Sequence, residues 1–372
     1  MKRVLVYGMT ENYGGVESVI INYYRHIPTD HVQFDFITNS QKPIAYQDEI
    51  LGNGGKVFVI PVKEKHPIEY RKVVHNFFKE KGNQYDAIWV NRNDLINIDY
   101  LKLARKYGIK KRIIHSHNTK LLVNDRTAFI KYLAHLHNKR QIAKYATDFW
   151  ACTSEAGNWL FPSNVNSKIQ IINNAVDLNK LKFDEKKRQK IRKMFNLQND
   201  FVIGNVGRLT FQKNQLFLID ILKDIVKEIP NAKLVLVGQG EYKDKLSKKA
   251  KSLGLENNVL LVGMQLDMQA WYSTFDFFVF PSIFEGLGLA AVEAQANGLP
   301  VIASKKVIPD SVKINPNFVF EALSLASYKW AQIIEEKNNL PKQRLDNKIV
   351  KKNFIEHHYE IDEAAKRLEK LF

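Results

Sequence analysis

The stretch Phe277-Phe-Val-Phe-Pro-Ser-Ile-Phe-Glu-Gly-Leu-Gly-Leu-Ala-Ala-Val-Glu-Ala-Gln-Ala-Asn-Gly-Leu-Pro300 decides the fold of this chain. Its first four apolar residues predict a buried strand, and the segment Leu287–Asn297 has the pattern of a helix. Gly298 and Pro300 fit the positions just beyond a helix end. A strand, a turn and a helix in this order predict a βα unit of a parallel sheet, where α/β proteins bind nucleotides.

Glycines and acids mark this turn as a binding site. Gly286 and Gly288 would let backbone N–H groups approach a ligand at the start of the helix. Glu285 and Glu293 lie eight residues apart, which is up to about 12 Å along a helix axis. Two carboxylates that attack one bond lie closer, at roughly 5–9.5 Å. We therefore expect the pair to hold two ends of an extended ligand, with a capped helix and an incidental acid as the structural alternative.

Strand-like and helix-like segments alternate along nearly the whole chain, which predicts α/β domains with doubly wound parallel sheets. The expected strands are Val4–Tyr7, Phe34–Thr38, Val57–Ile60, Ala87–Val90, Ile113–His115, Phe149–Cys152 and Ile169–Ile172, then Phe201–Val206, Lys233–Val237, Val259–Val262, Phe277–Phe280 and Val301–Ala303. The clearest helical patterns are Val16–His26, Tyr70–Lys81, Arg126–Tyr145, Asn214–Glu228 and Leu287–Asn297.

The 372 residues suit two Rossmann-like domains facing a cleft. The lysine-rich stretch 178–200 has no strand signal, so we place an N-terminal domain at 1–177 and a C-terminal domain at 178–353. A helical pattern at 354–371 could return to pack on the first domain.

A second candidate site follows the strand Phe201–Val206. Arg208 and Lys213 lie on the next loop, where a forked donor and a point cation would suit a diphosphate. Two basic residues on a loop are also common by chance. On the following βα turn, Gly238 and Gly240 could approach a base or a ribose, although one Gly-x-Gly pattern is weak.

The first domain offers two further features. Gly14 and Gly15 precede a helix whose early acid, Glu17, would also complement the helix dipole in a purely structural turn. His115 and His117 end another strand on the same side, so one would face the cleft. A histidine at a strand end is more often structural, and a zinc site here would lack a third ligand nearby.

The formal charge of +17 is concentrated in residues 101–145, which hold twelve Lys/Arg against one acid, Asp125, for a net +11. Such a surface suits nucleic acid, an anionic lipid surface or a phosphorylated acceptor. No zinc-finger, RNP-like or helix-turn-helix pattern occurs, so nucleic acid is the least supported partner. Within the segment, Phe129, Leu133, Leu136 and Ile142 form an incomplete apolar stripe beside lysines and arginines.

The single cysteine and the start of the chain predict a cytoplasmic protein. Cys152 ends a strand-like run, so we expect a buried structural thiol and no internal disulfide. No apolar run is long enough to span a bilayer or to form a signal peptide.

Together these motifs resemble the family-4 retaining glycosyltransferases of GT-B architecture, most of all the branch that builds bacterial exopolysaccharide and capsule. The matching parts run in order from residue 1 to about 330: Gly14-Gly15-Val-Glu17, His115-Ser-His-Asn118, Asn174-Ala-Val-Asp177, Gly207-Arg-Leu with Gln-Lys-Asn214, Gly238-Gln-Gly240, and the acids Glu285 and Glu293. One departure is Ala175, where the family has glycine.

The resemblance implies a role for each site residue. Arg208 and Lys213 would bind the diphosphate of a nucleotide sugar, first a UDP-sugar, and Glu293 the ribose. Glu285 with Gly286, Leu287, Gly288 and Leu289 would hold the donor sugar. His117 would be the cleft histidine, and Gly14 with Gly15 would lie at the reacting centre. The implied acceptor is a glycan or a lipid-diphosphate-linked saccharide, and the implied stereochemical course is retention.

Two further expectations concern cofactors and rival functions. The chain contains no Asp-x-Asp, the usual carboxylate clamp for a divalent metal, so we expect metal-independent transfer with no cofactor. A nucleotide-sugar 2-epimerase on the same architecture and a basic nucleic-acid-binding protein are the alternatives. A dinucleotide-dependent oxidoreductase is excluded, since the loop Gly8–Gly15 lacks Gly-x-Gly-x-x-Gly.

Overall fold

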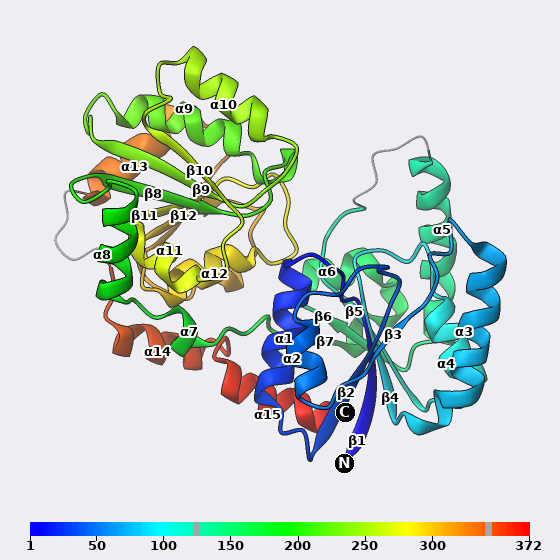
Figure 1. The fold of residues 1–372 in the computed structure, drawn as a ribbon. Helices are drawn as coiled ribbons and strands as arrows, with labels where there is room; N and C mark the ends of the chain where they lie inside the picture. Colours follow the sequence, from blue (N-terminus) through cyan, green and yellow to red (C-terminus); the bar gives the residue numbers. More distant parts are fainter. Residues whose placement is uncertain (122–126, 339–343) are drawn as a thin grey trace. The chain divides into compact units, whose positions relative to one another are not determined.

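The computed structural model describes residues 1–121, 127–338 and 344–372. It divides into two compact units: unit 1 comprises Met1–Ala175 with Ile361–Phe372, and unit 2 comprises Val176–Glu360 (Figure 1). Each unit is a parallel sheet with helices on both faces, so the predicted fold class is confirmed. The boundaries of the units lie two residues before the first predicted boundary and seven residues after the second.

Unit 1 contains a seven-stranded parallel sheet in the order β3-β2-β1-β4-β5-β6-β7. The strands are β1 (Lys2–Tyr7), β2 (Val32–Thr38), β3 (Val57–Val59), β4 (Ala87–Arg92), β5 (Lys111–Ser116), β6 (Asp148–Ala151) and β7 (Ile169–Ile171). The strand order reverses beside β1, so the loops after β1 and β4 meet at the switch point where α/β sheets bind ligands.

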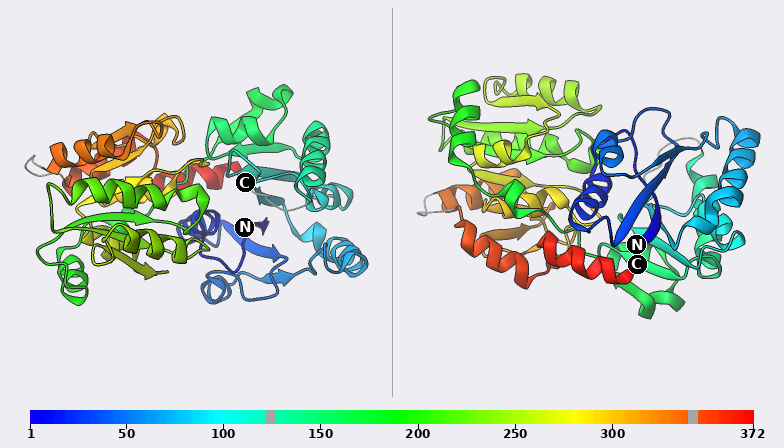
Figure 2. Two further views of the ribbon diagram at one scale, coloured as in Figure 1. Left: turned by 90° about the horizontal axis from the view of Figure 1, so that it is seen from above. Right: turned by 60° about the horizontal axis from the view of Figure 1, so that its bottom comes forward.

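The helices of unit 1 include one from the far end of the chain. They are α1 (Gly15–His26), α2 (Gln47–Gly52), α3 (Pro67–Lys81), α4 (Asp99–Lys106), α5 (Ala128–Gln141), α6 (Ser154–Leu160) and α15 (Ile361–Leu371). Helix α15 packs on α1, and His31 Nδ1 lies 2.8 Å from Glu369 Oε1. Phe372 contacts the aromatic rings of Phe34, Trp89 and Trp150. Both chain ends therefore lie in unit 1 (Figure 2).

Unit 2 contains a six-stranded parallel sheet in the order β10-β9-β8-β11-β12-β13. The strands are β8 (Phe201–Val206), β9 (Ala232–Val237), β10 (Val259–Gly263), β11 (Phe277–Phe280), β12 (Val301–Ser304) and β13 (Phe318–Glu321). Strand β13, a four-residue edge strand that pairs with β12, was not predicted from the sequence. The order reverses between β8 and β11, so the two candidate loops of this unit follow adjacent strands.

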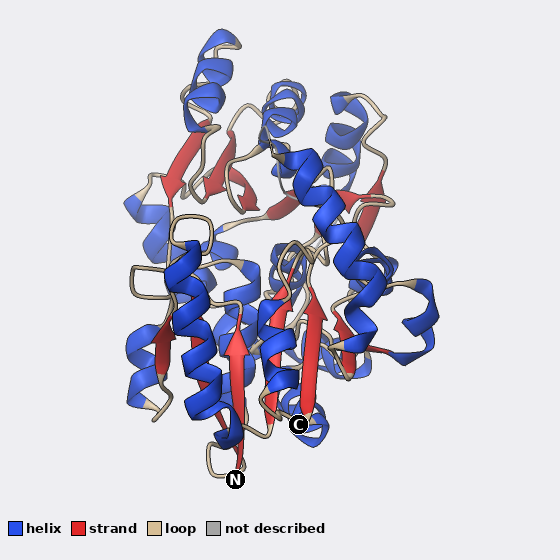
Figure 3. Ribbon diagram, turned by 90° about the vertical axis from the view of Figure 1, so that its right-hand side faces the viewer, coloured by secondary structure: helices blue, strands red, loops and turns tan. Residues whose placement is uncertain are grey.

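Blue helices lie beside red strands throughout the molecule (Figure 3), and the labels in Figure 1 show helices on both faces of this second sheet. They are α7 (Leu178–Leu181), α8 (Glu185–Met194), α9 (Gln215–Ile225), α10 (Lys243–Ser252), α11 (Met268–Thr274), α12 (Leu289–Ala296), α13 (Ser327–Asn338) and α14 (Asn347–Glu356). Helix α9 packs against α10 and α13, whereas α11 packs against α7 and α8. The strandless stretch 178–200 is thus largely helical.

The predicted single helix at 354–371 is wrong. Helix α14 ends at Glu356 in unit 2, and α15 begins at Ile361 in unit 1. Between them His358 has φ 64°, a left-handed conformation that ends a helix. The Tyr359 carbonyl accepts the Val176 N–H at 3.0 Å, so the residues of this break pair with the first residues of unit 2.

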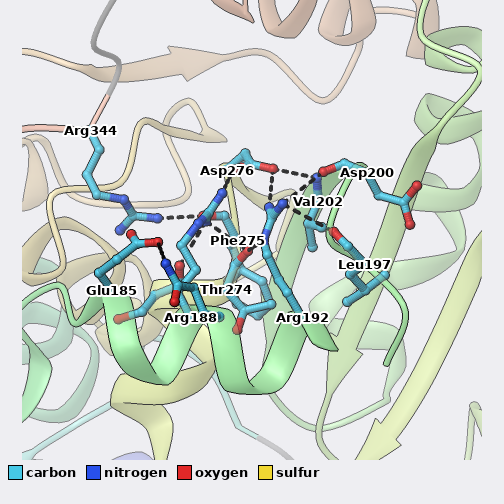
Figure 4. Close-up of polar contacts among 12 residues, drawn as sticks. Glu185, Arg188, Arg192, Leu197, Asp200, Val202, Thr274, Phe275, Asp276 and Arg344 are labelled. Carbon is cyan, nitrogen blue, oxygen red and sulfur yellow. Dashed lines mark hydrogen bonds and ion pairs between the residues drawn. The ribbon is translucent and has the colours of Figure 1, made fainter. Parts of the chain in front are cut away.

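Three arginines bind the end of α11 and the residues after it (Figure 4). Two of them lie in α8, and the third, Arg344, lies in the segment before α14. Arg188 and Arg192 both form ion pairs with Asp276, the first at 2.6 Å. Arg188 Nη1 also donates to the carbonyls of Ser273, Thr274 and Phe275. Arg344 Nη2 reaches the Phe275 carbonyl as well. Cations at the carboxyl end of a helix are attracted to the negative end of its dipole, so the cluster stabilises α11.

Cys152 is 1% exposed, and burial raises its thiol pKa to about 12, which fits the expected structural thiol. Among the residues that the structure describes, no helix is long and apolar enough to cross a membrane.

Candidate nucleotide-sugar site

Two loops of unit 2 are joined into one structure by hydrogen bonds. The loop after β8 contains a 3-10 turn, Phe211–Lys213, and its Gln212 exchanges two bonds with the loop after β11. The Gln212 carbonyl accepts the Ile283 N–H at 2.8 Å, and Gln212 Nε2 donates to the Phe284 carbonyl at 2.9 Å. Asn214 Nδ2 donates to the Pro281 carbonyl at 3.1 Å. The motifs around Arg208–Asn214 and Glu285 therefore form one site, although about seventy residues separate them.

Lys213 and Glu285 form the central ion pair of this site. Lys213 Nζ lies 2.6 Å from Glu285 Oε1, and the two side chains are only 15% and 8% exposed. The ammonium group also lies 4.8 Å from the centroid of the Phe280 ring. An ammonium group has three N–H donors, so Lys213 can donate to an anion such as a phosphate in addition to Glu285.

Arg208 is placed differently from Lys213. Its residue is exposed, while its backbone carbonyl accepts Gln215 Nε2 at 2.9 Å. The structure thus brings Lys213, but not the Arg208 guanidinium, into the ion pair with Glu285. The guanidinium remains accessible to an anion from solvent.

Glu293 lies in α12 with its carboxylate against Tyr272. Tyr272 Oη donates to Glu293 Oε2 at 2.7 Å. Burial raises the pKa of Glu293 to about 7, and the Tyr272 hydrogen bond and the Lys213 charge oppose this rise. The influence of Lys213 connects Glu293 electrostatically to the pair that contains Glu285.

Glu285 lies on the turn before the helix that carries Glu293, as the sequence predicts. Helix α12 begins at Leu289, two residues later than predicted, so Glu285 lies in the loop before it. Gly288 has φ 88°, which favours glycine and turns the chain into the helix. A Cβ at this position would lie 3.0 Å from Ile308 Cδ1 and 3.1 Å from Phe280 Cε1. Gly286 and Leu287 are buried, Leu287 being 3% exposed.

Gly238 and Gly240 are glycines because the backbone packs closely there. A Cβ on Gly238 would lie 2.0 Å from the Gly207 carbonyl oxygen, and one on Gly240 would lie 2.3 Å from that of Leu209. The Leu209 N–H also donates to the Gln239 carbonyl at 2.9 Å. These contacts explain both glycines without a ligand, so their proposed approach to a base or ribose stays a prediction.

In unit 1, Gly14 and Gly15 begin α1 beside a buried acid. Gly14 is the N-cap residue of α1, and Glu17 is 7% exposed. Thr10 Oγ1 donates to Glu17 Oε1 at 2.6 Å. Burial raises the pKa of Glu17, against hydrogen bonds that include one from the backbone of Gly14. Glu17 therefore stabilises the turn at Gly14, as the structural alternative expects.

His115 and His117 lie side by side, with ring centroids 4.0 Å apart. Asn91 Nδ2 donates to the Tyr7 carbonyl at 3.1 Å, so Asn91 Oδ1 faces His117 Nε2 at 2.8 Å. Nε2 must then carry the proton of His117, which leaves Nδ1 as an acceptor. Nδ1 is buried without a hydrogen-bond partner among the described residues. Burial lowers the pKa of His117 to about 3, so the ring is neutral at physiological pH.

Some basic side chains of residues 101–145 donate hydrogen bonds to backbone carbonyls within unit 1. Arg112 donates to the carbonyls of Tyr145 and Ile109, and Lys139 Nζ donates to that of Asn158 at 2.9 Å. Helix α5 nevertheless exposes apolar side chains: Phe129 is 71% exposed and Ile130 68%. The predicted apolar stripe is thus divided, because its last member, Ile142, is fully buried. Asp125 and Arg126 lie outside the described residues.

Three residues that make these contacts had no role predicted from the sequence: Tyr272 and Gln212 in unit 2, and Asn91 in unit 1. Tyr272 belongs to an apolar segment that reads as core, and nothing in its spacing indicates a bond to Glu293. Gln212 is an ordinary loop residue by composition. Asn91 gave a signal, since it is the polar residue directly after the predicted strand Ala87–Val90.

Residues 186–370 match the sequence family described as glycosyl transferases group 1. The "putative glycosyltransferase EpsF" of Bacillus subtilis (strain 168) is 32% identical over 315 residues, which cover 82% of this chain and 80% of that protein. This chain belongs to the group 1 glycosyltransferases. The match favours glycosyl transfer over both alternatives, the 2-epimerase and the nucleic-acid-binding protein.

Other relatives of this glycosyltransferase match over different extents. The "UDP-Gal:alpha-D-GlcNAc-diphosphoundecaprenol alpha-1,3-galactosyltransferase" of Escherichia coli is 38% identical over 141 residues, which are 37% of this chain and 36% of that protein. The crystal structure of Anabaena Alr3699/HepE in complex with UDP and glucose aligns with a TM-score of 0.78 at 18% identity, covering 100% of this chain and 99% of that one. The structural likeness supports the GT-B fold.

No cluster of three or more His, Cys, Asp or Glu side chains that could hold a metal ion occurs within the described ranges. The expectation of metal-independent transfer remains a prediction.

Proposed function

We propose that this glycosyltransferase moves a hexose or N-acetylhexosamine from a nucleotide sugar to a glycan or lipid-linked saccharide. The first candidate for the donor is a UDP-sugar. The observation that carries the proposal is the joined pair of loops in unit 2, which bring Lys213 and Glu285 into contact at the start of α12. The relatives support the choice of substrates: one is named for UDP-Gal and a diphosphoundecaprenol-linked acceptor, and HepE was crystallised with UDP and glucose.

The proposed chemistry uses charge in unit 2. When the bond between the sugar and the diphosphate breaks, its electron pair leaves with the diphosphate and the sugar gains oxocarbenium character. Lys213, the Arg208 guanidinium and the N–H groups at the start of α12 would stabilise the leaving anion. Glu285 would hold the sugar, and Glu293 would accept hydrogen bonds from the ribose. Net retention and independence from metal are part of the proposal.

The pathway we propose is synthesis of a bacterial exopolysaccharide or capsule. Two Staphylococcus aureus relatives, CapM and CapH, support this proposal, because both are named as capsular polysaccharide biosynthesis glycosyltransferases. We also propose that the enzyme works at the inner face of the plasma membrane, where α5 would contact anionic lipid. Phe129 and Ile130 near the start of this helix and Arg140 near its end are exposed, and basic residues near such a surface contribute about 1 kcal/mol each.

Two measurements test the proposed reaction. Thermal unfolding across a panel of nucleotide sugars identifies the donor, because a ligand that binds the folded state raises the melting temperature. Release of UDP from the stabilising donor should then require an acceptor saccharide. Release without any acceptor, with a changed sugar, would favour the 2-epimerase instead.

The variant Glu293→Ala should weaken donor binding strongly, since a hydrogen bond to a charged group is worth roughly 1.5–3 kcal/mol.

A further inference from the structure

Tyr272 has a hydroxyl group that is committed to Glu293. The residue lies in α11 with its side chain fully buried. Its hydroxyl lies 2.7 Å from Glu293 Oε2, whereas its other polar neighbour, the Ala290 carbonyl, is 3.4 Å away. A buried hydroxyl needs a partner, and a carboxylate is a stronger acceptor than a carbonyl. Glu293 is therefore the principal partner of this hydroxyl.

The Tyr272 ring is fixed from several sides. It packs against Phe275 and Phe278, with centroids 6.2 Å and 5.8 Å away. The carbonyl of Tyr272 accepts Arg344 Nη2 at 3.4 Å, and the arginine cluster holds the end of α11 (Figure 4). Because both ring and backbone are held, the hydroxyl is a fixed point from which the carboxylate can be oriented.

Glu293 depends on this fixed point. Glu293 is partly buried in α12, and its neighbours in the chain, Val292 and Ala294, have no polar side-chain group. Within the described part of the chain, Tyr272 makes the hydrogen bond to this carboxylate. One oxygen is thus occupied, and the second is left for a ligand.

We propose that Tyr272 is the positioning residue for Glu293: its hydroxyl holds one carboxylate oxygen, so that the other accepts the ribose hydroxyls of the donor. This inference rests on the proposed ribose-binding role of Glu293. The hydroxyl has two effects, since it fixes the rotation of the carboxylate and stabilises its charged form.

Because the hydroxyl stabilises the charged form of Glu293, its loss should change how the ionisation of Glu293 depends on pH. Burial already raises the pKa of Glu293 to about 7, and loss of a hydrogen bond to the charged form should raise it further, by about one unit. At pH 7 the variant Tyr272→Phe would then be ionised about five-fold less than the wild type. At pH 9 both would be almost fully ionised.

The experiment measures binding of UDP-glucose by calorimetry between pH 6 and 9. UDP-glucose is the probe because its diphosphate has no terminal monoester group that titrates near pH 6. We expect Tyr272→Phe to bind UDP-glucose more weakly than wild type at pH 9, where only the orientation of the carboxylate is lost, and the weakening to be about five-fold larger at pH 7. The control Tyr24→Phe removes another buried hydroxyl, which donates to the Ile50 carbonyl at 3.2 Å. It should leave the affinity for UDP-glucose unchanged at both pH values. Equal weakening at every pH would show a merely structural role and overturn the proposal.

A second measurement does not depend on the ligand. The side-chain carboxyl carbon of Glu293 can be followed by NMR in the ligand-free protein, with Glu293→Gln to assign its signal. Its titration midpoint should rise in Tyr272→Phe, and an unchanged midpoint would refute the positioning role. If the midpoint rises while Glu293→Gln binds UDP-glucose as well as wild type does, the proposed role of Glu293 at the ribose fails, and with it the ligand half of this inference.

Discussion

Lys213 Nζ and Glu285 Oε1 lie 2.6 Å apart in a largely buried ion pair that joins the two loops of unit 2. Removing one partner of such a pair leaves an uncompensated charge, so Glu285→Gln should lower the free energy of unfolding by about 3 kcal/mol. UDP would supply the missing negative charge, and it should therefore raise the melting temperature of Glu285→Gln more than that of wild type.

The matched control is the more exposed pair of Lys249 and Asp220, whose side chains are 28% and 38% exposed. Asp220→Asn should cost less than about 1 kcal/mol and leave the UDP effect unchanged. An equal UDP-induced rise in melting temperature for Glu285→Gln and wild type would mean that the diphosphate does not reach Lys213.

Arg208→Ala should lower turnover more than it weakens donor binding, because the guanidinium is needed most as negative charge develops on the leaving diphosphate. We expect a loss of about 100-fold in kcat in steady-state assays. Lys245→Ala, which removes an exposed cation from α10, is the control and should have wild-type kinetics. Wild-type turnover in Arg208→Ala would place the diphosphate elsewhere.

The pH dependence of donor binding should follow Glu293. Ribose hydroxyls donate to the charged carboxylate, so the donor binds the ionised form of a group whose pKa burial raises to about 7. Affinity should therefore fall as pH drops from 8 to 6, and Glu293→Gln should remove this dependence. The free energy of unfolding depends on pH in the opposite direction. Because the pKa of Glu293 is raised in the folded state, protonation favours folding at low pH, and this contribution is lost as the pH rises through about 7. A pH-independent affinity in wild type would argue against the ribose contact.

Asn91→Asp should give the enzyme a new acid limb in its pH–rate profile. A carboxylate 2.8 Å from His117 Nε2 would stabilise the imidazolium, whose pKa burial now holds at about 3. As the pH falls towards the raised pKa, Nδ1 would gain a proton and cease to be an acceptor. Asn91→Leu, which removes the acceptor without adding charge, should lower activity at all pH values. Identical profiles for Asn91→Asp and wild type would show that the protonation state of His117 is irrelevant to turnover.

Cosedimentation with liposomes tests the membrane proposal. Binding should appear with anionic but not neutral lipid and should fall as NaCl rises. Arg140→Glu with Lys144→Glu should weaken it, whereas the same charge change at Lys186 and Lys190 of α8, in unit 2, should not. Lys139 is avoided because it donates to backbone carbonyls. Equal binding to neutral and anionic liposomes would contradict the proposal.

Patterns of buried strands and glycine turns predicted the fold well, because a parallel sheet buried on both faces leaves apolar runs that are easy to recognise. The twelve predicted strands all occur. The edge strand β13 was not predicted because it follows the last recognisable motif of the chain. The break between α14 and α15 escaped because His358 has no glycine-like signal for its left-handed conformation.

The site was predictable where the chain places polar residues and glycines on the loops after strands and in the helix that follows. Lys213 and Glu285 were both identified, but their direct contact depends on the pairing of β8 with β11 and on Gln212, which no spacing reveals. Tyr272 was missed because its function depends on three-dimensional packing: in sequence it is one more aromatic residue of an apolar helix.

The return of the last helix to unit 1 also sets an order of synthesis. Unit 1 is completed by residues 361–372, and 185 residues of unit 2 are translated between its two parts. At about 5–20 residues per second, the ribosome would need roughly ten to forty seconds to supply them. During that time, Trp89 and Trp150 would lack the covering ring of Phe372. The nascent first unit thus exposes aromatic surface that a chaperone can bind, while the second unit can finish folding before it.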